Sequence, residues 1–252
     1  MSKRSYNVWL MGGLGNQLFQ INYGYRLRGL GHEVHFVDTL TKHSLLTKKI
    51  LSWTIHPYVL DKIIPVECRT LNAFPVLFAK GNILNQWSNY MGCELSGTLP
   101  RHIFGYFQCR ELHDSVYFEK DISSLLWLDS SDRTDIAAHL RFGDAPNLEQ
   151  NIKYYISALK KVSDCEVCIC TDDKDFAKQF LDENSFNNYY FSEGDLIDDF
   201  RVLANASVVI AAPSTFSFWA IKLSAHVKEF YIPKELYAEL GAPSKSPKVH
   251  VI

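Results

Sequence analysis

Hydrophobic and polar residues alternate along the second half of the chain as strands and helices that follow one another. Apolar runs of strand length occur at residues 136–140, 167–170, 189–191, 207–211 and 229–232. Stretches with helical spacing lie between them, at residues 151–162, 174–181, 196–204 and 215–224. Unbroken apolar strands that alternate with helices predict a parallel sheet with helices on both faces.

The amino-terminal part predicts a second unit of the same kind. An apolar strand over residues 6–11 runs into a turn with three glycines, and helical spacing then continues to about Leu30. Residues 33–37 form the next strand-like run. This order places the glycine turn at the carboxyl end of a strand, where open α/β sheets bind ligands.

Two sheets are needed to explain both halves, and we expect a cleft between them. The polar segment 129–134 precedes the clean alternation, so the predicted domains are residues 1–130 and 131–252. Residues 39–100 fit helix and strand equally well, and we predict no element there. The tail, 241–252, has turn chemistry, and we expect it to cross back or to fray.

Composition excludes several classes of protein. The chain has 252 residues, 47% of them hydrophobic, which is typical of a globular protein and not of a disordered one. Its 26 basic and 28 acidic side chains leave no excess of positive charge for nucleic acid. Six cysteines without a visible secretory signal indicate reduced thiols, and no apolar run reaches the length of a membrane span. We expect a cytoplasmic protein.

The glycine turn is the first candidate binding site. Glycine lets the backbone approach a ligand, and the amides at the start of a helix favour an anion. The residues expected to bind are Gly13, Leu14, Gly15 and Asn16. A tight turn that needs glycine for geometry alone is the alternative interpretation. Leu18 stands where a dinucleotide motif has its last glycine, and the turn has no P-loop lysine.

A second candidate follows the first strand of the second half, in the segment HLRFGD. His139 and Arg141 are two residues apart and therefore share one side of the strand. A guanidinium donates paired hydrogen bonds to a diphosphate, and an imidazole beside it can donate another or hold the base. Asp144 closes the segment. A histidine satisfied within the core is the alternative for His139.

The turn TDD follows the next strand. Asp172 and Asp173 can accept the N–H groups of guanine, or they can cap the helix that follows. Asp173 and Asp175 also match the D-x-D pattern of metal-dependent sugar-nucleotide enzymes, but so short a pattern recurs by chance.

The segment PSTFSFW opens a later helix with several hydroxyl groups. A simple N-cap needs one hydroxyl, so this density at the positive end of a helix indicates an anion site. The residues expected to bind are Ser214, Thr215, Phe216 and Ser217.

Two further clusters have a structural interpretation. Cys168 and Cys170 lie on a predicted buried strand, and with Cys165 they lack the fourth ligand of a zinc site. Asp198 and Asp199 begin a helical run and complement its dipole, although a role facing the cleft stays open.

Together these segments resemble the bacterial alpha-1,2-fucosyltransferases. The matching segments appear in the order of that family: MGGLGNQLFQ at residues 11–20, GYFQCREL at 105–112, HLRFGD at 139–144, the pair Tyr154-Tyr155, the TDD turn, and DDF at 198–200 followed by STFSFWA at 214–220. The resemblance implies a GT-B fold, in which two Rossmann-like domains face a cleft and the carboxyl-terminal domain binds the donor.

The resemblance also implies an activity. It is the transfer of L-fucose from GDP-β-L-fucose to O2 of an acceptor sugar, often galactose, with inversion and with neither a metal ion nor a cofactor. Arg141 would hold the β-phosphate, Asp172 or Asp173 would contact guanine, and Gln108 would contact the acceptor. The amides of residues 13–15 and 214–217 would complete the phosphate site.

The base that accepts the proton of the acceptor hydroxyl is less defined. Asp144 is the first candidate and His139 the second. A loose transition state does not require a dedicated base. The chain departs from the family where Phe142 replaces a second arginine, Ala145 a tyrosine and Phe218 a tryptophan. Because that arginine is absent, the affinity for the donor, and the identity of the donor, can differ from those of the family.

Two other functions remain open. One is an NAD(P)-dependent oxidoreductase that uses residues 13–15 for a dinucleotide and Asp38 for its ribose. The other is a non-catalytic module that binds a sugar or a nucleotide. The sequence leaves the acceptor and the oligomeric state undefined. We expect GDP-fucose and an oligosaccharide as partners, and at most peripheral association with an inner membrane.

Overall fold

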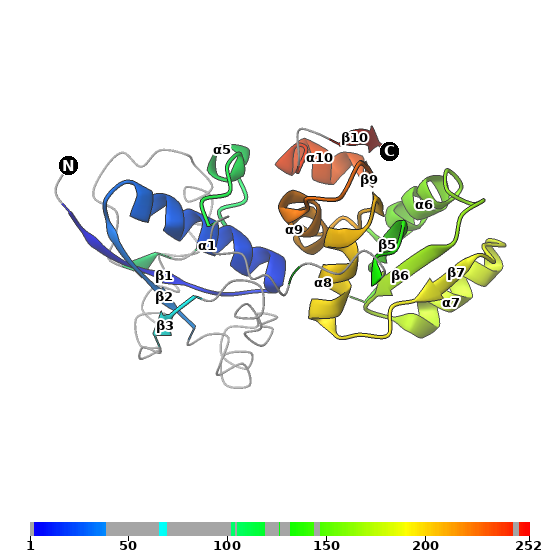
Figure 1. Ribbon diagram of the computed structural model, residues 1–252, viewed down its shortest axis with the longest axis horizontal. Helices are drawn as coiled ribbons and strands as arrows, with labels where there is room; N and C mark the ends of the chain where they lie inside the picture. The colour runs from blue at the N-terminus through cyan, green and yellow to red at the C-terminus, as the bar shows by residue number, and fades with distance from the viewer. Residues whose placement is uncertain are drawn as a thin grey trace. The chain divides into compact units, whose positions relative to one another are not determined.

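The chain divides into two compact units, Met1–Ser123 and Ser124–Ile252. The described residues of each unit form one parallel sheet (Figure 1). The computed structural model describes residues 3–38, 66–69, 102–103, 105–118, 126, 132–143, 147–243 and 247–252. Most of the segment 39–100, for which the pattern predicted no element, therefore lies outside the described residues.

The sheet of unit 1 has the strand order β3-β2-β1-β4, and all of its pairs are parallel. β1 pairs with β2 along its whole length, with Ser5 opposite Glu33. Helix α1 connects these two strands, as the sequence pattern predicted. The elements are β1 (Ser5–Trp9), α1 (Leu14–Gly29), β2 (Glu33–Val37), β3 (Cys68–Arg69), β4 (His102–Ile103) and α5 (Arg110–His113).

Helix α1 is buried along most of its length and organises the segment that follows β4. The Asn22 side chain donates to the carbonyl oxygens of Leu112 (3.3 Å) and Ser115 (2.9 Å) and accepts from the Tyr117 amide (2.8 Å). The rings of Tyr23 and Phe107 stack with their centroids 4.1 Å apart. These contacts hold residues 105–117 against α1.

The sheet of unit 2 has the order β10-β9-β8-β5-β6-β7, again with parallel pairs. The order reverses between β5 and β8, so this is a doubly wound sheet with its switch point there. Its strands are β5 (Ile136–Leu140), β6 (Val167–Thr171), β7 (Tyr189–Phe191), β8 (Val208–Ile210), β9 (Glu229–Ile232) and β10 (Lys248–Val251). Its helices are α6 (Leu148–Leu159), α7 (Lys174–Glu183), α8 (Leu196–Asn205), α9 (Thr215–Leu223) and α10 (Lys234–Leu240).

Helices cover both faces of this sheet (Figure 1). Alternate residues of β5, such as Ala138 and Leu140, join a buried cluster with α6 and α7. The opposite face packs against α8 and α9, where the rings of Phe200 and Phe216 meet at 5.2 Å. His139 projects to this second face, with its ring 5.1 Å from that of Phe216. The predicted α/β class with helices on both faces is confirmed.

The paired tyrosines of α6 brace the carboxyl ends of three strands. The Tyr154 hydroxyl reaches the carbonyl oxygens of Ala211 (2.8 Å) and Tyr231 (3.0 Å), beyond β8 and in β9. The Tyr155 hydroxyl accepts from the amide of Arg141, directly after β5, at 3.1 Å. Buried backbone groups need such partners where the ladder ends.

The tail is more ordered than its turn chemistry predicted. Helix α10 ends directly before the tail, and within the tail strand β10 forms and pairs with β9 in register from Lys248 opposite Glu229. His250 lies 2.7 Å from the Glu229 carboxylate and stacks on the Tyr231 ring. Of the two predicted alternatives, the tail crosses back onto the sheet and does not fray.

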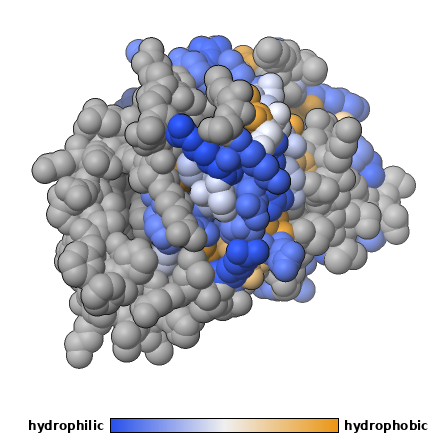
Figure 2. Space-filling model, turned by 90° about the vertical axis from the view of Figure 1, so that its left-hand side faces the viewer, coloured by the Kyte–Doolittle hydropathy of each residue, from blue (hydrophilic) through white to orange (hydrophobic). Residues whose placement is uncertain are grey.

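The described residues on one face of the molecule are mostly hydrophilic (Figure 2). On the face drawn in Figure 2, apolar residues show only as small patches among hydrophilic ones. Within the part of the chain that the structure describes, no helix combines the length and apolar character needed to span a membrane.

Phe142 points into an aromatic cluster between β5, α6 and α7. Its ring centroid lies 5.6 Å from that of Tyr155, 4.8 Å from Phe176 and 5.5 Å from Phe180. Phe142 is 6% exposed, whereas Phe176 is 37% exposed. The position that holds a second arginine in the resembling family is thus part of the core here.

We therefore expect Phe142→Arg to destabilise the protein by about 4 kcal/mol, because a charge would be buried among rings. Phe176→Arg is the matched control, since its side chain can reach solvent and should cost less than about 1 kcal/mol. Urea unfolding of the two variants measures the difference. Equal midpoints would show that position 142 tolerates the arginine.

Candidate functional site

The switch point of unit 2 gathers those residues selected by the sequence analysis in this half that the structure describes. β5 ends with His139 and Leu140, and Arg141 follows it. β6 leads into Asp172, and β8 leads into the turn before α9. Because the strands are parallel, these ends lie at one edge of the sheet, where doubly wound folds bind ligands.

His139 is buried and neutral. It is 8% exposed, and its Nδ1 lies 3.0 Å from the Ser217 hydroxyl oxygen. Burial, and then the positive charge of Arg141, lower its pKa to about 3. The imidazole therefore carries no charge at neutral pH and contributes only hydrogen bonds to the edge.

Arg141 supplies the positive charge beside it. The residue is half-buried, and its amide is held by Tyr155. Its effect on the pKa of His139 shows that the two side chains interact electrostatically. A guanidinium in this position can bind a phosphate group through paired, charge-assisted hydrogen bonds.

The two aspartates of the TDD turn have backbone partners. The Asp172 carboxylate accepts from the amides of Phe142 (2.8 Å) and Gly143 (3.1 Å), so it holds the loop that carries Arg141. Asp173 caps α7 and accepts from the Phe176 amide at 3.0 Å. Asp173 therefore has the capping role considered for this turn, whereas Asp172 has a different structural role, and a contact with guanine stays a prediction.

The turn before α9 uses most of its hydroxyl groups internally. Ser214 is the N-cap and accepts from the Phe216 amide at 3.1 Å. Ser217 is fully buried and donates to the Ala212 carbonyl oxygen at 3.3 Å. Thr215 is the more exposed of the three hydroxyl residues. Of this set, Thr215 is therefore the residue placed best to meet a ligand.

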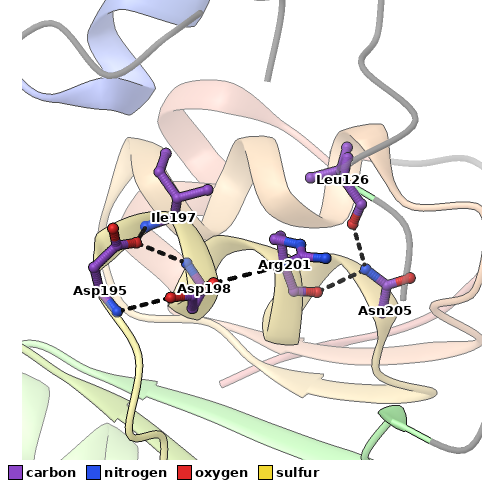
Figure 3. Close-up of polar contacts among 6 residues, drawn as sticks. All are labelled: Leu126, Asp195, Ile197, Asp198, Arg201 and Asn205. Carbon is purple, nitrogen blue, oxygen red and sulfur yellow. Dashed lines mark hydrogen bonds and ion pairs between the residues drawn. The ribbon is translucent and has the colours of Figure 1, made fainter. Parts of the chain in front are cut away.

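Helix α8 begins at the same edge with a complete capping box, shown in Figure 3. Asp195 accepts from the amides of Ile197 (2.7 Å) and Asp198 (3.2 Å), and Asp198 accepts from the Asp195 amide (3.0 Å). At the other end of the helix, Asn205 donates to the carbonyl oxygens of Leu126 and Arg201. Asp198 therefore stabilises the helix start, in agreement with the dipole interpretation.

Asp199 is a site candidate that the sequence analysis left undecided. Burial raises the pKa of its carboxyl group, while hydrogen bonds from Ser192 and Cys170 and the charge of Lys174 lower it. Within the described residues its Oδ1 is buried without a hydrogen-bond partner. The Cys170 thiol lies 3.8 Å from the Asp199 carbonyl oxygen, which places α8 beside the end of β6. In the sequence, the signal for Asp199 was a carboxylate on the side of an amphipathic helix that is expected to be buried.

In unit 1 the glycine turn needs glycine at position 12, which has a φ of 75°. A Cβ there would lie 2.6 Å from Nδ2 of Asn16. Gly13 is the N-cap of α1 and has no side chain to cap it, so the first amides of α1 are left to other partners. Gln17 donates to the Gly12 carbonyl oxygen at 3.0 Å and fixes the turn.

The structure brings two predicted residues of unit 1 together. Gln108 donates through Nε2 to Oδ1 of Asn16 at 2.8 Å, across 92 positions of sequence. Gln20 binds both the Met11 amide (2.9 Å) and the Gly105 carbonyl oxygen (3.0 Å). The segments MGGLGNQLFQ and GYFQCREL therefore form one structure.

Solved structures with a similar fold are glycosyltransferases. The fucosyltransferase NodZ from Bradyrhizobium superposes with a TM-score of 0.55 at 14% identity, over 89% of this chain and 93% of that one. NodZ co-crystallised with GDP, described as an alpha-1,6-fucosyltransferase, gives the same values. The E. coli heptosyltransferase WaaC with ADP has a TM-score of 0.51 at 10% identity, over 98% and 93% of the two chains. The chain has the GT-B fold.

No protein-family model and no curated protein matches the chain. The likeness to NodZ and WaaC is therefore a likeness of GT-B architecture.

Two sequence candidates remain to be placed on this GT-B fold. Asp144, the first choice for a base, lies outside the described residues. Cys168 and Cys170 are buried on β6 and Cys165 is exposed, all with free thiols. In the described parts of the chain no three histidine, cysteine or acidic side chains are arranged to hold a metal ion.

The low pKa of His139 predicts an acid-sensitive fold. Below pH 6.5 the unfolded chain binds a proton at this residue, whereas the folded chain does not until about pH 3. Stability is therefore lost as the pH falls through this window, by about 1.4 kcal/mol per pH unit. We expect His139→Asn to lose about 2 kcal/mol less than the parent between pH 6.5 and pH 5.

Urea unfolding at the two pH values measures this difference. Any packing cost of the substitution enters at both values and cancels. A parallel decline of the two proteins would contradict the assignment of a neutral His139.

Proposed function

We propose that the chain is an inverting fucosyltransferase that transfers L-fucose from GDP-β-L-fucose to O2 of an acceptor sugar, with galactose as the expected acceptor. The observation that carries the proposal is Arg141 beside a neutral His139 at the switch point of unit 2. The GT-B fold supports it, and so does the order of motifs that resemble alpha-1,2-fucosyltransferases.

The donor is assigned to unit 2. Cleavage of the bond between the anomeric carbon and the β-phosphate leaves negative charge on GDP while positive charge grows on the sugar. Arg141 would stabilise this diphosphate, with the positive end of α9 near Thr215 as a second contribution. These groups would do the work that a divalent cation does in metal-dependent transferases. We therefore propose catalysis without a metal ion or a cofactor.

The reaction is a single displacement. The acceptor O2 attacks the anomeric carbon from the face opposite GDP, the carbon–oxygen bond to the β-phosphate breaks, and the β-linked donor gives an α-linked product. The proton of O2 goes to a base or to solvent. A residue with a pKa of about 3 binds protons weakly, which argues against His139 as the base. Asp144 stays the first candidate on the sequence alone.

The nucleoside requires acceptor groups for its N–H and O–H donors. Asp172 and Asp173 retain some acceptor capacity, although both hold backbone amides. Asp199 Oδ1 also has no partner in the described residues, but it is closed off from solvent and is not proposed as a guanine contact.

Unit 1 would bind the acceptor. Gln108 and Asn16 form a polar pair beside the amides that begin α1. Amide side chains of this kind donate to and accept from sugar hydroxyl groups. NodZ is described as an alpha-1,6 enzyme, so the proposed 1,2 linkage rests on the motif resemblance alone.

A donor and linkage screen tests the proposal. The full chain is incubated with GDP-fucose and other nucleotide sugars on a panel of galactosides, in the presence of EDTA, and the products are analysed by mass spectrometry and by NMR of the linkage. We expect an α-1,2-fucosyl product. An α-1,6 product would refute the proposed 1,2 linkage. Loss of transfer in EDTA that manganese restores would refute the metal-free mechanism. Tight binding of NAD(H) without binding of GDP would favour an oxidoreductase.

Arg141→Ala should reduce the turnover of fucose transfer by about 100-fold to 1,000-fold and weaken GDP binding by about tenfold. Arg133→Ala is the matched control, because Arg133 precedes β5 at the opposite edge of the same sheet, 3.3 Å from His226. Initial rates and calorimetric titration with GDP measure the two effects. Equal turnover in the Arg141 and Arg133 variants would overturn the role of Arg141.

A further inference from the structure

Ser217 joins two groups at the switch point of unit 2. Its side chain is fully buried, and its Oγ lies 3.3 Å from the Ala212 carbonyl oxygen and 3.0 Å from Nδ1 of His139. Because the hydroxyl is closed off from solvent, it cannot itself meet a bound ligand. It can act on one only through His139.

The direction of the two hydrogen bonds follows from the count of protons. A carbonyl oxygen only accepts, so the two contacts of Ser217 are both hydrogen bonds only when it donates its single hydrogen to Ala212. The hydroxyl oxygen can then only accept from His139, and Nδ1 must carry a hydrogen atom. A neutral imidazole has one N–H, so Nε2 is left as an acceptor.

We infer that Ser217 is a positioning residue that fixes His139 in the Nδ1–H tautomer, so that His139 offers its ligand a hydrogen-bond acceptor. This reassigns Ser217 from direct donor binding. A phosphate oxygen at neutral pH has no hydrogen to donate, so Nε2 cannot serve the diphosphate. The ligand group at His139 must be an N–H or an O–H.

The identity of that group rests on the proposed function. His139 and Arg141 are two residues apart along an extended chain, which separates their Cα atoms by about 6.6 Å. If the guanidinium holds the diphosphate, the imidazole lies one group further along the substrate. The ring of Phe216, 5.1 Å from that of His139, adds an apolar surface beside it. We assign the partner of Nε2 to the nucleoside, as an N–H of guanine or a hydroxyl of ribose.

The tautomer is measured directly in the free protein. Long-range 1H–15N correlation spectra of the chain labelled in its nine histidines distinguish Nδ1–H from Nε2–H, and the signal of His139 is identified by its loss in His139→Asn. We expect Nδ1–H in the parent protein and an altered tautomer in Ser217→Ala. Nε2–H in the parent would overturn the inference.

Ser224→Ala is the matched control. Ser224 follows the other end of α9, and its hydroxyl also donates to a carbonyl oxygen, that of Ala204 at 2.6 Å, without contact to His139. Ser217→Ala loses two hydrogen bonds and Ser224→Ala loses three, because Ser224 also accepts from the amides of His226 and Val227. The control therefore tests whether a loss of stability alone changes the tautomer. A change of tautomer in both variants would contradict a specific role of Ser217.

A nucleotide panel then identifies the donor group. GDP is compared with IDP, N1-methyl-GDP, 2′-deoxy-GDP and 3′-deoxy-GDP, which remove or block the N–H and O–H groups of guanosine. We expect Ser217→Ala to weaken GDP by about tenfold. We also expect that in Ser217→Ala one analogue loses less affinity relative to GDP than it does in the parent protein. The group missing or blocked in that analogue is then the partner of Nε2. If every analogue loses the same affinity relative to GDP in the parent protein and in Ser217→Ala, the assignment to the nucleoside is overturned.

The two proposals fail in different ways. The Nδ1–H tautomer without fucose transfer would refute the proposed function and leave the role of Ser217 intact. Fucose transfer with Nε2–H at His139 would refute the role of Ser217 alone.

Discussion

Three consecutive backbone amides leave the sheet after β5, and the site depends on how they are satisfied. Tyr155 accepts from the first, at Arg141, and the Asp172 carboxylate accepts from the next two, at Phe142 and Gly143. Amides that lose their ladder partners are costly when they are buried without replacements. These two side chains therefore determine the path of the loop, and the path places the guanidinium of Arg141 at the carboxyl edge.

The alternation of side chains along β5 separates two functions. His139 belongs to the side of α8 and α9, whereas Phe142 enters the aromatic cluster with α6 and α7. Burial keeps His139 neutral, and Arg141 supplies a positive charge beside it. A neutral acceptor and one cation therefore lie side by side. The second arginine of the resembling family has no counterpart at position 142, because that position belongs to the core of this chain.

The sequence pattern predicted the regular elements well where packing is repetitive. Strands β2, β5, β7 and β9 have the predicted bounds. Helix α6 begins three residues earlier than predicted, because Asn147, with a φ of 56° and no capping hydrogen bond from its side chain, gives no recognisable start signal. Helix α10 and strand β10 were not predicted, since β10 is defined by pairing with β9 and by contacts of His250 that no local pattern reveals.

By itself, the sequence determined the fold class and the segments that carry chemistry, because hydrophobic periodicity and glycine turns act locally. Only the tertiary structure decided which polar groups are used up and which remain to meet a ligand. Asp172 is committed to a loop, Ser217 to His139 from 78 positions away, and Gln108 to Asn16 from 92 positions away. Hydrogen-bond partners and burial depend on residues distant in sequence, and they set the charge and the donor or acceptor character of each side chain.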